Sequence, residues 1–190
     1  MTYLGIYLIA GLGFLLRVIN LATPKGLVFD EVYYVDAARD FLAFGVEVTQ
    51  DEPEFVVHPP LGKWFIAIGI RIFGDNEFGW RFATAVAGTI AIILIGLIAQ
   101  RLFRSQFLTL LATFLAAVDG LAFVHSRTSL LDNFLTALIL AATYFFIRKN
   151  YVVTAIFLGL ALGTKWSALY FIVVFGAVAL YRAFTHHTGR

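Results

Sequence analysis

Charged residues are scarce in this sequence, and cysteine is absent. Only 14% of the 190 residues are Asp, Glu, Lys or Arg, whereas 61% are hydrophobic. A water-soluble domain of this length could not bury so much apolar surface, so the composition excludes an ordinary soluble protein and predicts membrane spans. Without cysteine there is neither a disulfide framework nor a thiolate metal site. The formal net charge of +2 is too small to indicate a nucleic-acid partner.

Proline and acidic residues are missing from most of the chain because they are concentrated in one segment. Residues 20–78 contain all four prolines and ten of the twelve acidic residues, which predicts a large loop outside the bilayer. Within this loop, residues 31–44 place apolar side chains opposite charged ones at helical spacing, and residues 61–73 show a similar pattern. We expect both segments to be helices lying flat at the membrane surface.

Six apolar runs are candidates for crossing the membrane, which takes about 20 apolar residues as a helix. They cover approximately residues 3–19, 81–99, 107–124, 131–147, 151–164 and 167–181. The sequence therefore predicts an all-α, polytopic helical bundle with a large first outer loop.

Basic residues determine the expected orientation, because short cytoplasmic loops concentrate Lys and Arg. The relevant residues are Arg101, Arg104, Arg148, Lys149, Arg182 and Arg190. With the N-terminus inside, six crossings put all of them on the cytoplasmic side. The acidic loop and the connections 125–132 and 164–167 then face the opposite side together. Tryptophans near these outer boundaries are expected to be interface anchors: Trp64, Trp80 and Trp166.

Asp30 and Glu31 directly follow the first apolar run and its connection. An aspartate at a helix start commonly accepts backbone hydrogen bonds, so capping alone would explain Asp30. A carboxylate at the outer water boundary could instead accept the proton of an attacking hydroxyl group as a general base. Both interpretations stay open at this point.

His58 and Lys63 flank two prolines in the run HPPLGK, residues 58–63. Paired prolines fix an extended approach and permit a helix to begin, which explains the prolines without any functional role. The two flanking side chains could also present hydrogen-bonding or cationic groups to a phosphate. The other three histidines lie far away or on the other side of the predicted membrane, so we expect no metal site.

Five further charges lie within or beside the predicted spans: Arg17, Asp119, Arg127, Asp132 and Lys165. A charge at the centre of a membrane helix costs about 2.5 to 3.5 kcal/mol on insertion scales, so such groups normally pair or line a polar cavity. Pairing of Arg127 with Asp132, or of Arg17 with Asp119, would explain most of them. A buried ion-pair network can also preorganise an anion site. We therefore expect Arg127 and Lys165, with Arg17, to face a lipid phosphate.

Six segments, taken in order, resemble the motif set of the protein O-mannosyltransferase family. They are Val28–Tyr34 (VFDEVYY), His58–Trp64 (HPPLGKW), Gly79–Arg81, Asp119–Gly120, Ser126–Asp132 (SRTSLLD) and Lys165–Trp166. The likeness extends over essentially the whole chain. Aminoarabinose transferases and other polyprenyl-phosphate-sugar transferases also carry an acidic motif after the first helix, but the HPPLGK, SRTSLLD and KW segments favour the mannosyl branch.

This resemblance implies a membrane glycosyltransferase of the GT-C architecture. Such an enzyme transfers mannose from polyprenyl-phosphate-mannose to Ser or Thr hydroxyl groups of exported proteins, with inversion at the sugar carbon. The proposed base of the family corresponds to Asp30, and Glu31 would orient the base or the acceptor. Cationic groups would stabilise the leaving phosphate, so no metal or other cofactor is required. The candidates for this role are His58, Lys63, Arg127, Lys165 and Arg17.

Members of this family are considerably longer, so we expect the remainder of the enzyme to be missing and this piece alone to be inactive. Two alternatives stay open: a related transferase with a different sugar or a lipid or glycan acceptor, and a non-catalytic membrane assembly subunit. The short N-terminus before the first span favours a bacterial plasma membrane over the endoplasmic reticulum, with the active site on the non-cytoplasmic side. Dimerisation and association with the translocon are left open.

Overall fold

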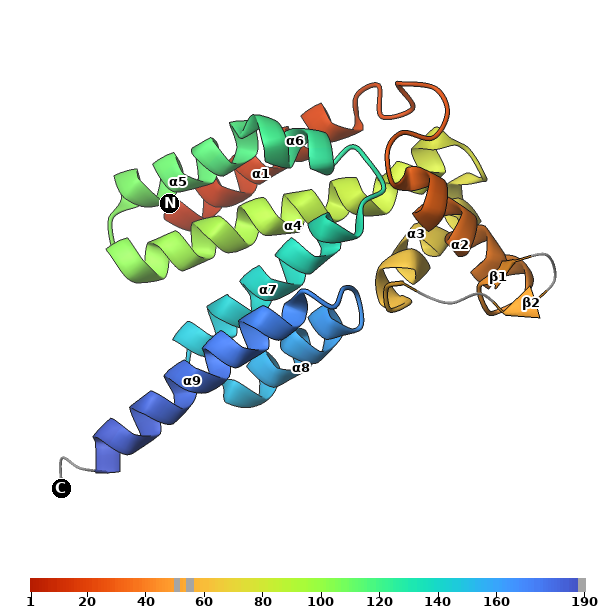
Figure 1. The fold of residues 1–190 in the computed structure, drawn as a ribbon. Coiled ribbons are helices and arrows are strands. Elements are labelled where there is room, and N and C mark those ends of the chain that lie inside the picture. Colours follow the sequence, from red (N-terminus) through yellow and green to blue (C-terminus); the bar gives the residue numbers. More distant parts are fainter. Residues whose placement is uncertain (50–51, 54–56, 188–190) are drawn as a thin grey trace.

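Helices make up about three quarters of the described chain in the computed structural model, which describes residues 1–49, 52–53 and 57–187 (Figure 1). They are α1 (Thr2–Val18), α2 (Glu31–Ala43), α3 (Leu61–Phe73), α4 (Glu77–Phe103), α5 (Gln106–Val118), α6 (Gly120–His125), α7 (Leu131–Ile147), α8 (Tyr151–Leu162) and α9 (Ala168–His187). The expected helical architecture is confirmed. A two-residue antiparallel ladder of β1 (Val48–Thr49) and β2 (Glu52–Pro53) was not expected from the sequence.

The helix α4 is the centre of the fold. On one side it packs against α1 and α5, and on the other against α3 and α7, while α8 and α9 extend the bundle beyond α7 (Figure 1). Asn76 begins this helix, because its side chain accepts hydrogen bonds from the backbone of Phe78 and Gly79. Arg104 ends it in the left-handed conformation, with a φ of 50°.

Two helices of the described chain are long and apolar enough to cross a membrane, namely Glu77–Phe103 and Ala168–Thr185. Four shorter apolar helices are α1, α5, α7 and α8. Their positions follow the predicted apolar runs, but α4 begins four residues before residue 81. Crossing of a membrane by these helices stays a prediction.

The expectation of one continuous helix over residues 107–124 is wrong. The chain leaves the helical conformation at Asp119, where ψ is 121°, and α5 and α6 are separate helices. The Asp119 side chain accepts a hydrogen bond from the backbone N–H of Ala122 at 2.7 Å and so caps α6. Aspartate stabilises a helix start in this way more than it stabilises a helix interior.

The segments predicted to lie at the membrane surface form α2 and α3, which pack on each other through buried side chains including Val35, Ala38 and Ile66. Trp80 belongs to the same buried cluster and is only 7% exposed, so the prediction that it is an interface anchor is wrong. Trp64 and Trp166 remain half-exposed, as an anchor requires. The location of α2 and α3 at a membrane surface stays a prediction.

Candidate functional site

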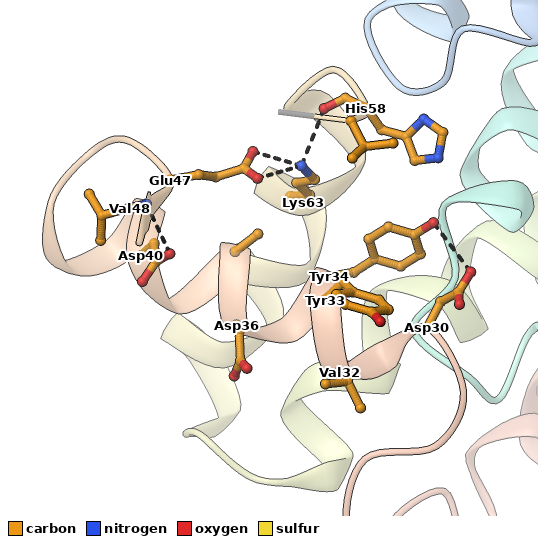
Figure 2. Close-up of a pocket in the computed structure, with 12 residues that line it drawn as sticks. Asp30, Val32, Tyr33, Tyr34, Asp36, Asp40, Glu47, Val48, His58 and Lys63 are labelled. Carbon is orange, nitrogen blue, oxygen red and sulfur yellow. Dashed lines mark hydrogen bonds and ion pairs between the residues drawn. The ribbon is translucent and has the colours of Figure 1, made fainter. Parts of the chain in front are cut away.

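An open pocket of about 600 Å³ lies beside the first turns of α2 (Figure 2). Its walls come from α2, from the β1 region and from the start of α3. The charged and aromatic residues that line it are Asp30, Tyr33, Tyr34, Asp36, Asp40, Glu47, His58 and Lys63. Asp30 of the acidic pair and the two ends of the HPPLGK segment, His58 and Lys63, therefore meet at one place.

Glu31 is fully buried, and both oxygens of its carboxylate accept hydrogen bonds from the protein. It forms an ion pair with Arg81, with distances of 2.7 Å from Nε to Oε1 and 2.8 Å from Nη2 to Oε2. The backbone N–H groups of Val28 and Ser129 also donate to it, each at 2.9 Å. A carboxylate with four such partners has no remaining capacity to receive a proton from a substrate.

Arg81 uses its guanidinium group to hold the connection between α1 and α2. Besides Glu31, it donates to the backbone carbonyl groups of Leu21, Pro24 and Gly26 at 3.3, 2.8 and 2.9 Å. The side chain is fully buried. This one residue of α4 therefore fixes the loop before Asp30 and the helix after it.

Asp30 differs from its neighbour because its carboxylate is open. It stands at the N-cap of α2, yet its side chain accepts no capping hydrogen bond from the backbone. Its one side-chain partner among the described residues is the hydroxyl of Tyr34, which donates to Oδ2 at 3.5 Å (Figure 2). The interpretation that Asp30 serves only to cap a helix is therefore not supported by the structure.

Tyr34 and His58 lie next to this open carboxylate, with their ring centroids 6.2 Å apart. Burial, together with the charges of Asp30 and Asp132, raises the pKa of Tyr34 to about 12, so its hydroxyl remains a donor at neutral pH. Burial, with the positive charges of Lys165 and Lys63, lowers the pKa of His58. His58 is therefore neutral at pH 7, and its buried Nδ1 has no partner among the described residues.

Lys63 uses its ammonium group to bind Glu47 and a backbone carbonyl group. Its ammonium group donates to both carboxylate oxygens of Glu47 at 2.7 Å and to the carbonyl oxygen of His58 at 3.2 Å. Both side chains of the pair are buried. Because an ammonium group has three N–H donors, Lys63 keeps none for a phosphate in this arrangement.

Lys165 lies in the turn between α8 and α9 and pairs with Asp132 in the first turn of α7. The distances from Nζ to the two carboxylate oxygens are 2.7 and 2.8 Å. Asp132 therefore pairs with Lys165 and not with Arg127, which corrects the pairing expected from the sequence.

Arg127 and Arg17 lie away from the pocket. Arg127 donates to the carbonyl groups of Leu16, Arg17, Ile19 and Asn20, so it caps the C-terminal end of α1. Arg17 is buried and donates to the carbonyl groups of Gly13 and Ala117. It does not pair with Asp119, so this expected pairing is also wrong.

Three residues of the site were not given a role by sequence reasoning. Tyr34 lies four positions after Asp30 in a helical segment, and this spacing predicts a contact. Arg81 is a charge at the start of a long apolar run, which indicates a buried partner. Glu47 lies in the segment between α2 and α3, where no periodic pattern signalled its pairing with Lys63. Among residues whose placement is described, no group of His, Asp and Glu is arranged to hold a metal ion.

A family profile described as dolichyl-phosphate-mannose-protein mannosyltransferase matches residues 57–190, which is more than half of the chain. The chain belongs to this mannosyltransferase family. A polyprenol-phosphate-mannose–protein mannosyltransferase of Mycolicibacterium smegmatis is 37% identical over 91% of the chain. A protein of the same description from Mycobacterium tuberculosis is 39% identical over 80% of the chain.

The likeness extends to the fold and to a second group of transferases. The structure is similar to a chain of the Saccharomyces cerevisiae protein O-mannosyltransferase Pmt1–Pmt2 complex bound to the sugar donor. The superposition covers 96% of the present chain, with a TM-score of 0.83 and 25% sequence identity. An undecaprenyl phosphate-aminoarabinose arabinosyl transferase of Pseudomonas aeruginosa is 33% identical over 70% of the chain. The chain spans 40% of the length of the M. smegmatis relative and 28% of the yeast chain.

Proposed function

We propose that this chain supplies the catalytic base of a protein O-mannosyltransferase. The reaction moves mannose from a polyprenyl-phosphate-mannose donor to the hydroxyl group of Ser or Thr in an exported protein. The observation that carries the proposal is the contrast within the acidic pair: Glu31 is buried and fully bonded, whereas Asp30 is open to the pocket. The descriptions of the relatives support the same donor and acceptor classes.

Asp30 acts on the acceptor hydroxyl. As the hydroxyl oxygen attacks the anomeric carbon, the new carbon–oxygen bond forms on the face opposite the phosphate and the bond to the phosphate oxygen breaks. The hydroxyl proton moves to Asp30, the bonding electrons leave with the phosphate, and the configuration of the sugar carbon inverts. A positioned base of this kind contributes about 10² to 10⁴ in rate.

Glu31 has a positioning role. A fully buried side chain cannot touch the acceptor, but its bonds to Arg81 and Ser129 fix the first turn of α2 against two other segments. The direction in which Asp30 faces is set by that turn.

Lys165 and His58 are the groups best placed to receive the leaving phosphate. Both lie within electrostatic reach of each other, because the positive charge of Lys165 contributes to the lowered pKa of His58. A cation and a neutral imidazole can both donate hydrogen bonds to phosphate oxygens. Lys63, Arg127 and Arg17 have other partners in this structure, so we give them structural roles ahead of phosphate binding.

A second candidate function is transfer of a different sugar, or transfer to a lipid or glycan. The likeness to an aminoarabinose transferase favours this alternative over a non-catalytic assembly subunit. The identity with that relative is lower and extends over less of the chain than the identity with the M. smegmatis mannosyltransferase. We therefore retain mannose and a protein acceptor as the principal proposal.

The setting of the reaction is part of the proposal. We place the helices in a bacterial plasma membrane, with the Asp30 pocket on the non-cytoplasmic side where exported proteins emerge. Pairing with a second subunit is supported by the yeast neighbour, which is a Pmt1–Pmt2 complex. Association with the translocon has no support in these observations.

The test uses membranes from cells that express the complete coding sequence containing this chain. Supplied with polyprenyl-phosphate-mannose and a Thr-containing peptide, they should form mannosyl peptide. Asp30→Asn should lower turnover about 10²- to 10⁴-fold without changing the amount of protein in the membrane. Asp36→Asn is the matched control, since it removes a carboxylate from the same helix and pocket. Wild-type turnover in the Asp30 variant would exclude Asp30 as the base.

A further inference from the structure

Lys165 differs from the other cation near the pocket in one respect. Lys63 donates three hydrogen bonds and has no free donor, whereas Lys165 donates two, both to Asp132. Within the described chain, neither the Lys165 nor the Asp132 side chain has another hydrogen bond. One N–H of the Lys165 ammonium group is therefore available to a ligand.

The backbone around Lys165 is fixed to a wall of the pocket. The indole N–H of Trp166 donates to the carbonyl oxygen of Val57 at 2.9 Å, and Val57 lines the pocket. The backbone N–H of Leu61 donates to the carbonyl oxygen of Gly163, also at 2.9 Å. These two bonds hold the turn before and after Lys165, so that only its long side chain remains to be oriented.

Asp132 supplies that orientation. The Lys165 side chain is 21% exposed and the Asp132 side chain is 43% exposed, so the lysine is the more deeply placed partner. The two short hydrogen bonds to Asp132 fix the direction in which the ammonium group of Lys165 points. The charges of Asp30 and Asp132 both raise the pKa of Tyr34, so both carboxylates lie within electrostatic range of its hydroxyl group.

We infer that Asp132 is a positioning residue for the lipid donor: it fixes the ammonium group of Lys165, with one free N–H, at the place where the phosphate of the donor binds. This inference rests on the proposed function, and it assigns to Asp132 a role beyond neutralising a charge. Asp132 acts through Lys165 and does not touch the phosphate, because two anions would repel each other.

The experiment measures binding of polyprenyl phosphate without a sugar to the purified full-length protein in detergent. Asp132→Asn should weaken binding about 10- to 100-fold, the range expected for loss of a hydrogen bond to a charged group. Asp132→Glu keeps the charge and should bind within about threefold of wild type. Glu77→Gln is the control, because it removes a carboxylate that pairs with a lysine, Lys25, outside the pocket, and it should bind like wild type.

A charge exchange separates positioning from a merely structural ion pair. The double variant Asp132→Lys with Lys165→Asp restores an ion pair, so its thermal unfolding temperature should stay near that of wild type. Its cation now stands on α7, so binding of polyprenyl phosphate should be lost. Wild-type affinity in the exchanged protein or in Asp132→Asn would overturn the inference, and so would a Glu variant that binds as weakly as the Asn variant.

The two proposals can fail separately. If the wild-type protein binds polyprenyl phosphate but forms no mannosyl peptide, the proposed reaction is wrong and the role of Asp132 stands. If it forms mannosyl peptide while Asp132→Asn binds the lipid phosphate normally, only the role of Asp132 is wrong.

Discussion

Glu31 and Arg81 are separated by fifty residues in the sequence and form a fully buried, two-point ion pair. The same carboxylate accepts the backbone N–H of Ser129, so one side chain joins α2, α4 and the connection before α7. Ser129 in turn donates its hydroxyl to the carbonyl oxygen of Trp80. The position of Asp30 therefore depends on three segments that meet at its neighbour.

Breaking this pair should destabilise the protein. Glu31→Gln leaves the Arg81 charge buried without a counter-ion, and loss of one partner of a buried pair costs about 3 to 5 kcal/mol. We expect a marked fall in the thermal unfolding temperature of the purified protein. The matched control is Asp36→Asn, which removes an exposed ion pair with Arg39 and should change the free energy of unfolding by at most about 1 kcal/mol. Equal stability of the two variants would contradict the structural role of Glu31.

The sequence predicted the helices well where an apolar run was long, because such runs have few other stable arrangements in a membrane. It also predicted Asp30, the HPPLGK segment and Lys165 on one side of the bilayer. The structure brings the first two into one pocket and fixes Trp166, the residue after Lys165, to Val57 in the wall of that pocket. The break at Asp119 was missed, because an aspartate inside an apolar run can either pair with a charge or cap a new helix.

The ion-pair partners could not be predicted from the sequence. Each cation near the site had several carboxylates and carbonyl groups within plausible reach, and only the packing of the helices chooses between them. Lys63 pairs with Glu47 from a segment without periodic pattern, and Arg127 binds carbonyl groups at the end of α1. Charge and spacing indicated that these residues have partners, but they did not identify the partners.

Tyr34 and Tyr33 offer a matched pair of variants on one helix. Tyr34→Phe removes the hydroxyl that donates to Asp30 and leaves the buried ring in place. Loss of one hydrogen bond of about 0.5 to 1.5 kcal/mol predicts a two- to tenfold fall in mannosyl transfer. Tyr33→Phe is the control, because Tyr33 lines the same pocket but is 71% exposed. If both variants transferred mannose at the wild-type rate, the contact between Tyr34 and Asp30 would have no catalytic importance.

The close approach of α3 and α4 depends on Gly69. A Cβ atom added there would collide with the carbonyl oxygen of Gly79, and backbone atoms cannot move aside easily. Gly69→Ala should therefore destabilise the protein by about 1 to 3 kcal/mol, the usual cost of overpacking. In Gly11→Ala the new methyl group meets no atom within 4 Å, and alanine favours helix, so stability should be unchanged or slightly raised. Thermal unfolding of the two variants side by side measures the difference.

His58 should make the stability of the protein depend on pH. Burial, reinforced by Lys165 and Lys63, lowers the pKa of His58 from 6.5, although Asp30 and Asp132 act in the opposite direction. As the pH falls below 6.5, the unfolded chain takes up a proton at this residue before the folded protein does. The free energy of unfolding therefore falls with falling pH in this window, and it becomes level once folded His58 is also protonated.

His58→Gln should remove this part of the pH dependence, so that the unfolding temperature of the variant falls less steeply than that of wild type between about pH 7 and pH 5. His125→Gln is the control, since His125 ends α6 and does not line the pocket. The difference in slope between the two variants measures the contribution of the pocket histidine. If the unfolding temperature of the His58 variant followed the wild-type curve, the imidazole would not be buried as a neutral group beside Lys165. The proposal that neutral His58 donates to the leaving phosphate would then lose its support.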